Sequence, residues 1–472
     1  LEIHDGGKCI IAFKYNDDGT IKEAVSANGM KNLYGYDTDK NLTKLDIDFN
    51  GKVLAQNRYA YDHNGNRTIK QQLRGTTYYT YDSINQLINV KYPDYEEQLF
   101  YDKAGNRSKR IVNDVTEHYL YDKRNRLIRQ VFQQPTGTTA KHYIYDNAGS
   151  LMNDGEKVYK NDGFNRVTQV TNKKGQVQIN RYDAEGLRYE MEENKKLVQF
   201  IFNENREVVV EKSNDNFNRL IRSYDLWASE CEPEKTWYHY ASDEQGSIVF
   251  ITDEEKICNK YDYDVWGNLT TCEEIIPNRY LYTGQQFDQI TQQYYLRARY
   301  YNPVIARFTQ EDIYRGDGLN LYTYCDNNSV IYYDPSGYSV CNGPTSKNPL
   351  KKLKILTENN SFYKEGGGSN LDDFITKHSE KHAFKPNVKS TKKSTQFNEN
   401  IDVAKLREDT LLYPDKINYR KDQNAIVYEK EYDFNISTVD TPTGSHRVFI
   451  NLDPKPNKMN RNSQFPYFGG IK

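Results

Sequence analysis

The sequence predicts a mainly β protein, in which an array of stacked β-hairpins precedes a small α+β domain. Three observations carry this prediction. Tyrosine is in excess, with 41 Tyr against 19 Phe and 3 Trp in 472 residues, and aromatic residues favour strands. Tyr-Asp pairs recur along the first part of the chain. From residue 339 onward the composition changes, because 35 of the 41 tyrosines lie before that point.

The Tyr-Asp pairs define a repeat. Within a unit such as YAYDHNGNRTIK, alternation before the Asp predicts a strand, and Asp followed by Asn-Gly predicts a tight turn. One hairpin is marginal in water, so we expect the units to stack. Less regular pairs follow at Tyr182 and Tyr263. The regular pairs, spaced by 25, 20, 20, 20 and 24 residues, begin at Tyr36, Tyr61, Tyr81, Tyr101, Tyr121 and Tyr145.

Charge and hydropathy exclude other classes. The chain has 66 acidic and 64 basic residues, and a net charge of −2. No run of 18 apolar residues occurs, so no membrane span is expected. The composition also disfavours a coiled coil or a disordered polymer. Because the chain begins with Leu1 rather than Met, we expect it to be the C-terminal part of a longer protein.

Over residues 36–268 the repeat resembles the RHS/YD-repeat family. This resemblance implies hairpins that spiral into a hollow β-shell. From Arg279 the sequence resembles the RHS repeat-associated core, which closes the shell. The resemblance implies YD/RHS repeats over 1–270, incomplete at the N-terminus, a core over 271–338 ending in DPSGY, and a variable toxin domain over 339–472. The core motifs are Tyr282-Thr283-Gly284, residues 294–303, Arg307-Phe308, Glu311-Asp312, residues 318–324 and Asp334-Pro335-Ser336-Gly337.

The same resemblance implies self-cleavage by carboxylates just after the DPxGL motif. Asp312 and Asp334 are the candidate acids, and Asp317 is a third. A protonated carboxyl beside an ionised one can activate water, and Arg307 is expected to hold them by a bidentate ion pair. Tyr338 replaces the family's Leu at the expected cut. The alternative is that Asp334 only forms a turn and Asp312 only a cap.

The last 134 residues differ in charge. Residues 339–472 hold 22 Lys and Arg against 16 Asp and Glu, or +6, whereas the first 338 residues carry −8. A basic domain favours a nucleic-acid partner, although +6 also suits ordinary solubility. Hydrophobic periodicity predicts helices over 371–384 and 401–412, then strands over 425–428, 432–436 and 446–452. This order is typical of an α+β domain.

The tail offers cations, hydroxyls and imidazoles without an acidic metal cage. The His378–His382 spacing does not match a metalloprotease motif, because Glu380 stands third rather than second or fourth. The two histidines alone could bind zinc, but no third ligand is evident, and no metal or cofactor is expected. The remaining set suits metal-independent RNA cleavage, in which one His takes the 2′-OH proton, another protonates the leaving oxygen, and cations stabilise the phosphorane. The candidate residues are Lys381, His382, Lys393, Ser394, Thr443, Ser445, His446 and Arg447.

The tail also resembles the barnase–EndoU–RelE-like ribonuclease toxins. The resemblance lies in EKHAF at 380–384, KKS at 392–394 and TGSHRV at 443–448. It implies that Lys381-His382 on a first helix and His446 on a late strand line the site. The alternative for His446 is a buried strand histidine with only a structural role.

The resemblances to the RHS/YD-repeat family and to the ribonuclease toxins imply a secreted, contact-dependent bacterial competition toxin. Its expected partners are an RNA substrate (tRNA or rRNA), a cognate immunity protein and an export machinery. The expected location is secreted or cell-wall associated, with the toxin domain acting in the cytoplasm of the target cell. Two alternatives stay open: a metal-dependent DNase or nucleotide-modifying toxin, and a wall-associated adhesion or carbohydrate-binding repeat protein.

Overall fold

The computed structural model describes residues 1–214, 216–223, 225–313, 320–339 and 341–342, and part of the tail: 396–397, 403, 406, 410, 416–420, 425–432, 434–438, 443–451 and 463–466. The chain divides into two compact units, Leu1–Lys347 and Asn348–Lys472. Among the described residues, none of the helical segments has the length and apolar character needed to span a membrane.

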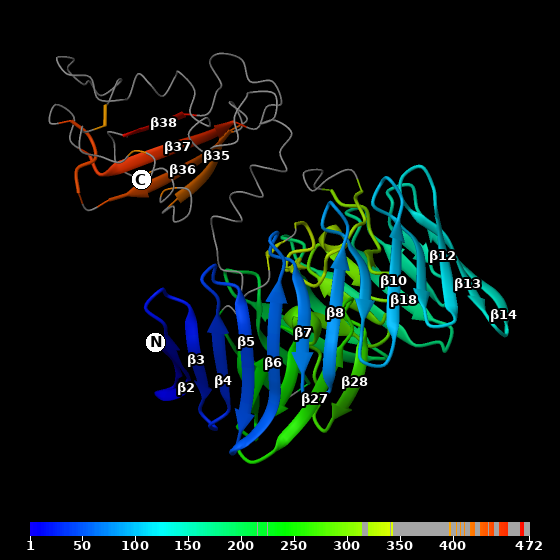
Figure 1. Cartoon of the computed structure of the whole chain (residues 1–472), viewed down its shortest axis with the longest axis horizontal. Coiled ribbons are helices and arrows are strands. Elements are labelled where there is room, and N and C mark those ends of the chain that lie inside the picture. Colours follow the sequence, from blue (N-terminus) through cyan, green and yellow to red (C-terminus); the bar gives the residue numbers. More distant parts are fainter. Residues whose placement is uncertain are drawn as a thin grey trace. The chain divides into compact units, whose positions relative to one another are not determined.

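Two antiparallel sheets of 14 strands each form the wall of the first unit, and every strand pairs with the next along the chain (Figure 1). The first sheet contains β1 (Glu2–Asp5), β2 (Lys8–Tyr15), β3 (Ile21–Ser26), β4 (Lys31–Tyr36), β5 (Leu42–Phe49), β6 (Lys52–Tyr61), β7 (Arg67–Gln72), β8 (Gly75–Tyr81), β9 (Leu87–Lys91), β10 (Glu96–Tyr101), β11 (Arg107–Val112), β12 (Val115–Tyr121), β13 (Leu127–Gln134) and β14 (Gly137–His142). The second contains β15 (Ile144–Tyr145), β16 (Leu151–Asn153), β17 (Lys157–Asn161), β18 (Val167–Asn172), β19 (Val177–Tyr182), β20 (Arg188–Glu193), β21 (Lys196–Phe202), β22 (Val208–Ser213), β23 (Asn216–Arg222), β24 (Leu226–Glu232), β25 (Thr236–Ser242), β26 (Ile248–Thr252), β27 (Ile257–Tyr263) and β28 (Leu269–Glu274).

The Asp of each repeat closes the turn that follows it. Asp62 Oδ1 accepts hydrogen bonds from the backbone N–H groups of Asn64 (2.9 Å) and Asn66 (2.8 Å). Gly65 has φ of 79° inside this turn, a region that glycine enters without steric cost. The same pair of bonds is made by Asp82, Asp102 and Asp122. The repeated hairpin predicted from the sequence is therefore confirmed.

The Tyr of most repeats bonds to the strand pair before it. Three successive hydroxyl groups donate to a backbone carbonyl 14 residues earlier: Tyr81 to Arg67 (2.7 Å), Tyr101 to Leu87 (2.8 Å) and Tyr121 to Arg107 (2.8 Å). Phe would fill the same space but leave the carbonyl without this donor, and a buried unpaired polar group is costly. This bond explains why the wall uses tyrosine rather than phenylalanine.

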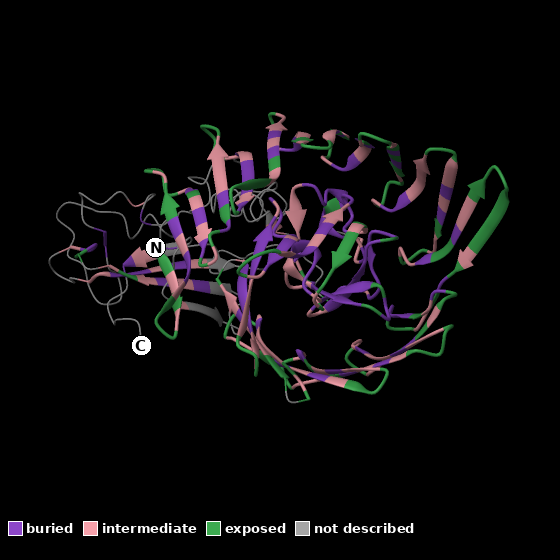
Figure 2. Ribbon diagram, turned by 90° about the horizontal axis from the view of Figure 1, so that it is seen from below, coloured by how far each residue is buried: buried purple, intermediate pink, exposed green. Residues whose placement is uncertain are grey.

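The segment after the wall packs between the two sheets. Tyr295 and Tyr300 of this segment share one buried cluster with Leu127 of the first sheet and Val170 of the second. Figure 2 shows buried residues concentrated between the curved sheets. This arrangement confirms the predicted β-shell with its core. The core elements are η1 (Tyr282–Gly284), β29 (Gln286–Asp288), β30 (Gln293–Leu296), β31 (Arg299–Asn302), β32 (Arg307–Phe308), η2 (Cys325–Asn327), β33 (Tyr332–Tyr333) and β34 (Cys341–Asn342).

Buried ion pairs join elements that are distant in the sequence. Arg188 on β20 lies 2.5 Å from Asp288 of the core, and both side chains are fully buried. Glu244 accepts from Arg67 at 2.6 Å and from Lys70 at 2.9 Å, and so links the two sheets. Removing one partner of such a pair leaves an uncompensated buried charge. These pairs therefore fix which parts of the wall face each other.

The second unit contains a four-stranded antiparallel sheet: β35 (Lys416–Arg420), β36 (Ala425–Glu431), β37 (Ser445–Asn451) and β38 (Ser463–Pro466). Val403, Leu406 and Thr410 have helical backbone, as expected for the helix over 401–412, whereas the helix expected over 371–384 lies outside the described residues. The strand expected over 432–436 is wrong: β36 ends at Glu431, and the described residues that follow are irregular. β35 and β38 were not predicted.

His239 on β25 gives the first unit a pH dependence. Its side chain is fully buried, and neither ring nitrogen has a hydrogen-bond partner in the described part of the chain. Burial lowers the pKa of His239 to about 4, against roughly 6.5 in an unfolded chain. Below pH 6.5 the unfolded state therefore binds a proton that the folded state does not, and stability falls with falling pH.

Because of His239, we expect the free energy of unfolding to fall by about 2 kcal/mol when the pH is lowered from 7 to 5. Urea unfolding of the full chain at both pH values measures the loss. His239→Phe should reduce the loss by that amount, whereas His63→Gln, at an exposed turn position, should leave it unchanged. Equal pH dependence in wild type and His239→Phe would contradict the assignment.

Candidate functional site

The Asp334 loop lies against the β30–β31 turn of the core. Asp334 Oδ1 accepts hydrogen bonds from the backbone N–H groups of Ser336 (3.0 Å) and Gly337 (2.8 Å). Gly337 has φ of 73°, and a Cβ there would lie 2.5 Å from the carbonyl oxygen of Leu296. Only glycine fits this contact. The DPSG motif thus forms a turn pressed onto the hairpin.

Arg299 on β31 joins the two predicted acids. Its Nη2 lies 2.8 Å from Asp312 Oδ2 and 3.7 Å from Asp334 Oδ2. The guanidinium also donates from Nε to the carbonyl of Gly337 and from Nη1 to that of Leu321 (3.1 Å). The guanidinium carbon Cζ of Arg299 lies 3.6 Å from the ring centre of Phe308. One fixed guanidinium therefore holds both carboxylates and the loop backbone.

The two carboxylates differ in their surroundings. Asp334 is 1% exposed and Asp312 is 5% exposed. Burial raises the pKa of Asp334, an effect that Arg299 and the hydrogen bonds from Ser336 and Gly337 oppose. Asp312 lies closer to the cation. Asp334, whose pKa is raised by burial, and Asp312 thus share one guanidinium, and a carboxyl pair with unequal surroundings is a known basis for acid–base hydrolysis.

The structure corrects the role expected for Arg307. Its Nη1 donates to Asn106 Oδ1 at 3.0 Å, and its Nη2 donates to the carbonyl of Asn125 at 2.7 Å. Both acceptors belong to wall turns, so Arg307 anchors β32 to the first sheet, and the acids are held by Arg299 instead. Arg299 and Arg307 both stand within the core motifs, but their spacing in the sequence does not show which of them contacts the two acids.

The expected scissile position is accessible. The Tyr338 side chain is 37% exposed, and its backbone N–H donates to Ser336 Oγ at 3.2 Å. Asp317, the third candidate acid, lies outside the described residues. The core therefore brings together Asp312, Asp334 and the backbone that leads directly into Tyr338.

In the tail, four of the predicted residues are described: Thr443, Ser445, His446 and Arg447. Lys381, His382, Lys393 and Ser394 lie outside the described residues. His446 is fully buried. Its Nδ1 lies 2.7 Å from Thr410 Oγ1, and its ring packs edge-on against Phe397, with ring centres 5.5 Å apart. This buried setting is the one expected if His446 has only a structural role.

The neighbours of His446 face the other side of β37, because successive strand residues alternate. There Arg447 forms an ion pair with Glu429, which is 3% exposed, and Ser445 Oγ donates to Glu431. Thr443 precedes the strand, and its Oγ1 accepts from the Ser445 N–H at 3.0 Å. The described structure therefore does not gather these four residues into one site. Sequence reasoning missed Glu429 and Glu431, although their spacing of two marks one face of a strand.

A comparison with family models shows the family to which the chain belongs. The teneurin YD-shell model matches residues 67–330, which include most of the wall and the greater part of the core. The chain belongs to the teneurin YD-shell family. It is accordingly an RHS/YD-repeat protein, as the Tyr-Asp units and the core motifs predicted.

This YD-shell protein is similar to two curated bacterial nucleases. The tRNA(Glu)-specific nuclease WapA of Bacillus subtilis subsp. natto is 30% identical over 427 residues, covering 84% of this chain and 18% of the relative. The tRNA nuclease WapA of Bacillus subtilis strain 168 is 32% identical over 350 residues, covering 70% of this chain and 15% of the relative. The chain thus spans less than a fifth of the length of either.

Solved structures share the YD-shell fold. The crystal structure of TcdB2-TccC3-Cdc42 matches with a TM-score of 0.55 and 19% identity, over 70% of this chain and 19% of that one. The Photorhabdus luminescens Tc holotoxin pore matches with a TM-score of 0.53 and 18% identity, over 70% of this chain and 19% of that one. At this identity the likeness establishes the fold alone.

Proposed function

We propose that the chain is part of a secreted, contact-dependent bacterial toxin, whose shell carries a C-terminal ribonuclease and whose producer is protected by a cognate immunity protein. One observation carries this proposal. The match to the tRNA(Glu)-specific nuclease covers 84% of the chain, whereas the first unit ends at Lys347 of 472 residues. The similarity therefore extends into the second unit, beyond the shell that many unrelated functions share.

The proposed reaction is cleavage of RNA, with tRNA as the favoured substrate, by attack of the 2′-OH on the adjacent phosphate. His382 is proposed to exchange protons with the reacting oxygens, and Lys381, Lys393 and Arg447 to stabilise the phosphorane. Ser394, Thr443 and Ser445 supply hydroxyl groups. A role for His446 as the second acid–base group requires access to a ring that the described structure buries against Thr410 and Phe397.

Incubation of the purified full chain with total RNA in EDTA tests this function. We expect discrete cleavage of small RNA, because the 2′-OH is an internal nucleophile and no metal is needed. A chain that ends at Tyr338 is the control and should leave the RNA intact. RNA that survives in EDTA but is cut after Mg²⁺ is added would overturn the metal-independent mechanism. Cleavage of plasmid DNA would favour the DNase alternative instead.

We also propose that the core cuts the chain by hydrolysis after Tyr338, near the C-terminal end of the first unit. The Arg299-bridged pair supports this step. Asp312 activates a water molecule, which adds to the Tyr338 carbonyl carbon, and Asp334 supplies the proton that the departing Ser339 nitrogen needs. The products are a carboxylate on Tyr338 and an amine on Ser339, so one water is consumed. Such general acid–base assistance contributes roughly 10²–10⁴ in rate.

A further inference from the structure

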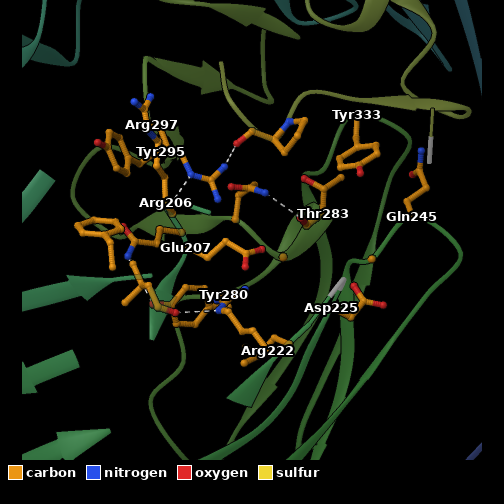
Figure 3. A pocket seen from close by; sticks show the side chains of 18 residues that line it. Arg206, Glu207, Arg222, Asp225, Gln245, Tyr280, Thr283, Tyr295, Arg297 and Tyr333 are labelled. Carbon is orange, nitrogen blue, oxygen red and sulfur yellow. Dashed lines mark hydrogen bonds between the residues drawn. The ribbon is translucent and has the colours of Figure 1, made fainter. Parts of the chain in front are cut away.

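A polar cavity lies on the side of the Asp334 loop where Pro335 is found (Figure 3). Its volume is about 120 Å³, which suits a small ligand rather than a nucleotide-sized cofactor. The turns after β21 and β23 form one wall, and η1 forms another. Neither the proposed nuclease nor the proposed self-cleavage uses this cavity.

Two arginines line the cavity without a carboxylate partner. Arg222 Nε donates to the carbonyl of Val208 at 2.9 Å, and Arg297 donates from Nε to the carbonyl of Arg206 at 2.8 Å and from Nη1 to that of Pro335. Within the described part of the chain, neither guanidinium forms an ion pair. Burial lowers the pKa of Arg297, Glu207 opposes this, and Arg222 adds to it. Both cations thus keep N–H donors for a ligand.

Thr283 of the Tyr-Thr-Gly motif adds a third polar group. Its side chain is 6% exposed and lines the cavity, yet Oγ1 has no hydrogen-bond partner in the described structure. Its φ is 49°, a conformation that is strained for a β-branched residue. Strain and a buried hydroxyl without a partner both mark positions held for a reason other than stability.

Acidic residues also reach the cavity wall, and their placement limits what it binds. Glu207 accepts from Asn203 at 3.2 Å within its own repeat turn, and Asp225 lies in the turn after β23, on the same wall (Figure 3). Neither carboxylate lies within ion-pair distance of Arg222 or Arg297 in the described residues. The two guanidinium groups therefore remain the groups best placed to recognise negative charge.

We propose that this cavity binds a small oxyanion, a carboxylate or a phosphate group, through Arg222, Arg297 and the Thr283 hydroxyl. A planar guanidinium matches both kinds of oxyanion by bidentate hydrogen bonds. The buried hydroxyl supplies a neutral donor to a third oxygen position. The site takes no part in the proposed nuclease reaction, and the bond from Arg297 to the Pro335 carbonyl places it beside the Asp334 loop.

Calorimetric titration of the full chain with inorganic phosphate and, separately, with succinate at constant ionic strength tests the proposal. We expect saturable one-to-one binding of at least one anion. The anion that binds more tightly identifies the source of the oxyanion. Arg222→Met and the isosteric Thr283→Val should each weaken binding at least tenfold. Arg129→Met removes the same charge from an exposed residue of β13 and should bind like wild type.

Absence of saturable binding of both anions to the wild-type chain would overturn the proposal. Binding to Thr283→Val and Arg222→Met with wild-type affinity would overturn it equally, because the anion would then lie elsewhere. Far-ultraviolet circular dichroism and unfolding midpoints of both variants establish that they are folded. If Arg222→Met fails to fold, Thr283→Val, which conserves shape, decides the result.

Discussion

Asp334→Asn is expected to keep the chain intact at 55.3 kDa, under conditions in which the wild type separates into two fragments at Tyr338. Asn preserves the side-chain oxygen that accepts from the N–H groups of Ser336 and Gly337, so the loop retains its turn. It cannot supply a proton as a carboxylic acid does. We expect the cleavage rate to fall by about 10²–10⁴-fold, measured by intact-mass spectrometry over time after purification.

The wild-type reaction should also slow as the pH rises. Burial raises the pKa of Asp334, and the proposed step needs the protonated acid, so the rate decreases as the pH rises through that raised pKa. Asp94→Asn, at an exposed turn, is the matched control and should cleave normally. A wild-type chain that stays whole for days, or an Asp334→Asn chain that splits at the wild-type rate, would reject carboxylate self-cleavage.

His382→Ala is expected to lower the rate of RNA cleavage by the full chain by about 10²–10⁴-fold, the usual contribution of a general acid or base. Its unfolding midpoint is measured alongside, so that a loss of activity is distinguished from a loss of folding. If His446 is the second group, His446→Ala produces a loss of the same size at temperatures where the variant is folded. The assay is the EDTA digestion of small RNA followed by denaturing electrophoresis.

Measuring the unfolding free energies of His382→Ala and His446→Ala distinguishes a catalytic role from a packing role. His446 fills a buried space beside Phe397 and bonds Thr410, so truncation to Ala removes contacts and a hydrogen bond, at a cost of roughly 2–4 kcal/mol. Activity that falls only in step with unfolding would assign His446 to the core of the tail. Wild-type activity in both variants would place the catalytic site elsewhere, and Arg447 with Glu429 is the next pair to substitute.

The wall was predictable from the sequence because its rules are local. Asp62 and Gly65 belong to the same short turn, so their order in the sequence is sufficient to place that turn. The Tyr-Asp alternation likewise fixes where each strand ends. These signals repeat, and repetition distinguishes them from chance.

The centre of the core was less predictable because it depends on contacts across the fold. Arg299 and Arg307 lie eight residues apart among similar neighbours, and only the packing of β31 against the Asp334 loop assigns the acids to Arg299. In the tail, residues 432–436 have the apolar and aromatic composition of a strand. There the backbone N–H of Ile436 bonds to the carbonyl of Thr443, which closes the loop between β36 and β37.

The tyrosine bonds that reach 14 residues back have a consequence for how the wall evolves. Each of these tyrosines donates to a carbonyl of the preceding strand pair, so a duplicated unit would carry its own donor and meet an equivalent acceptor. The wall can therefore lengthen or shorten by whole units without a redesign of its ends. The length of the curved wall thus becomes a quantity that gene duplication adjusts in steps.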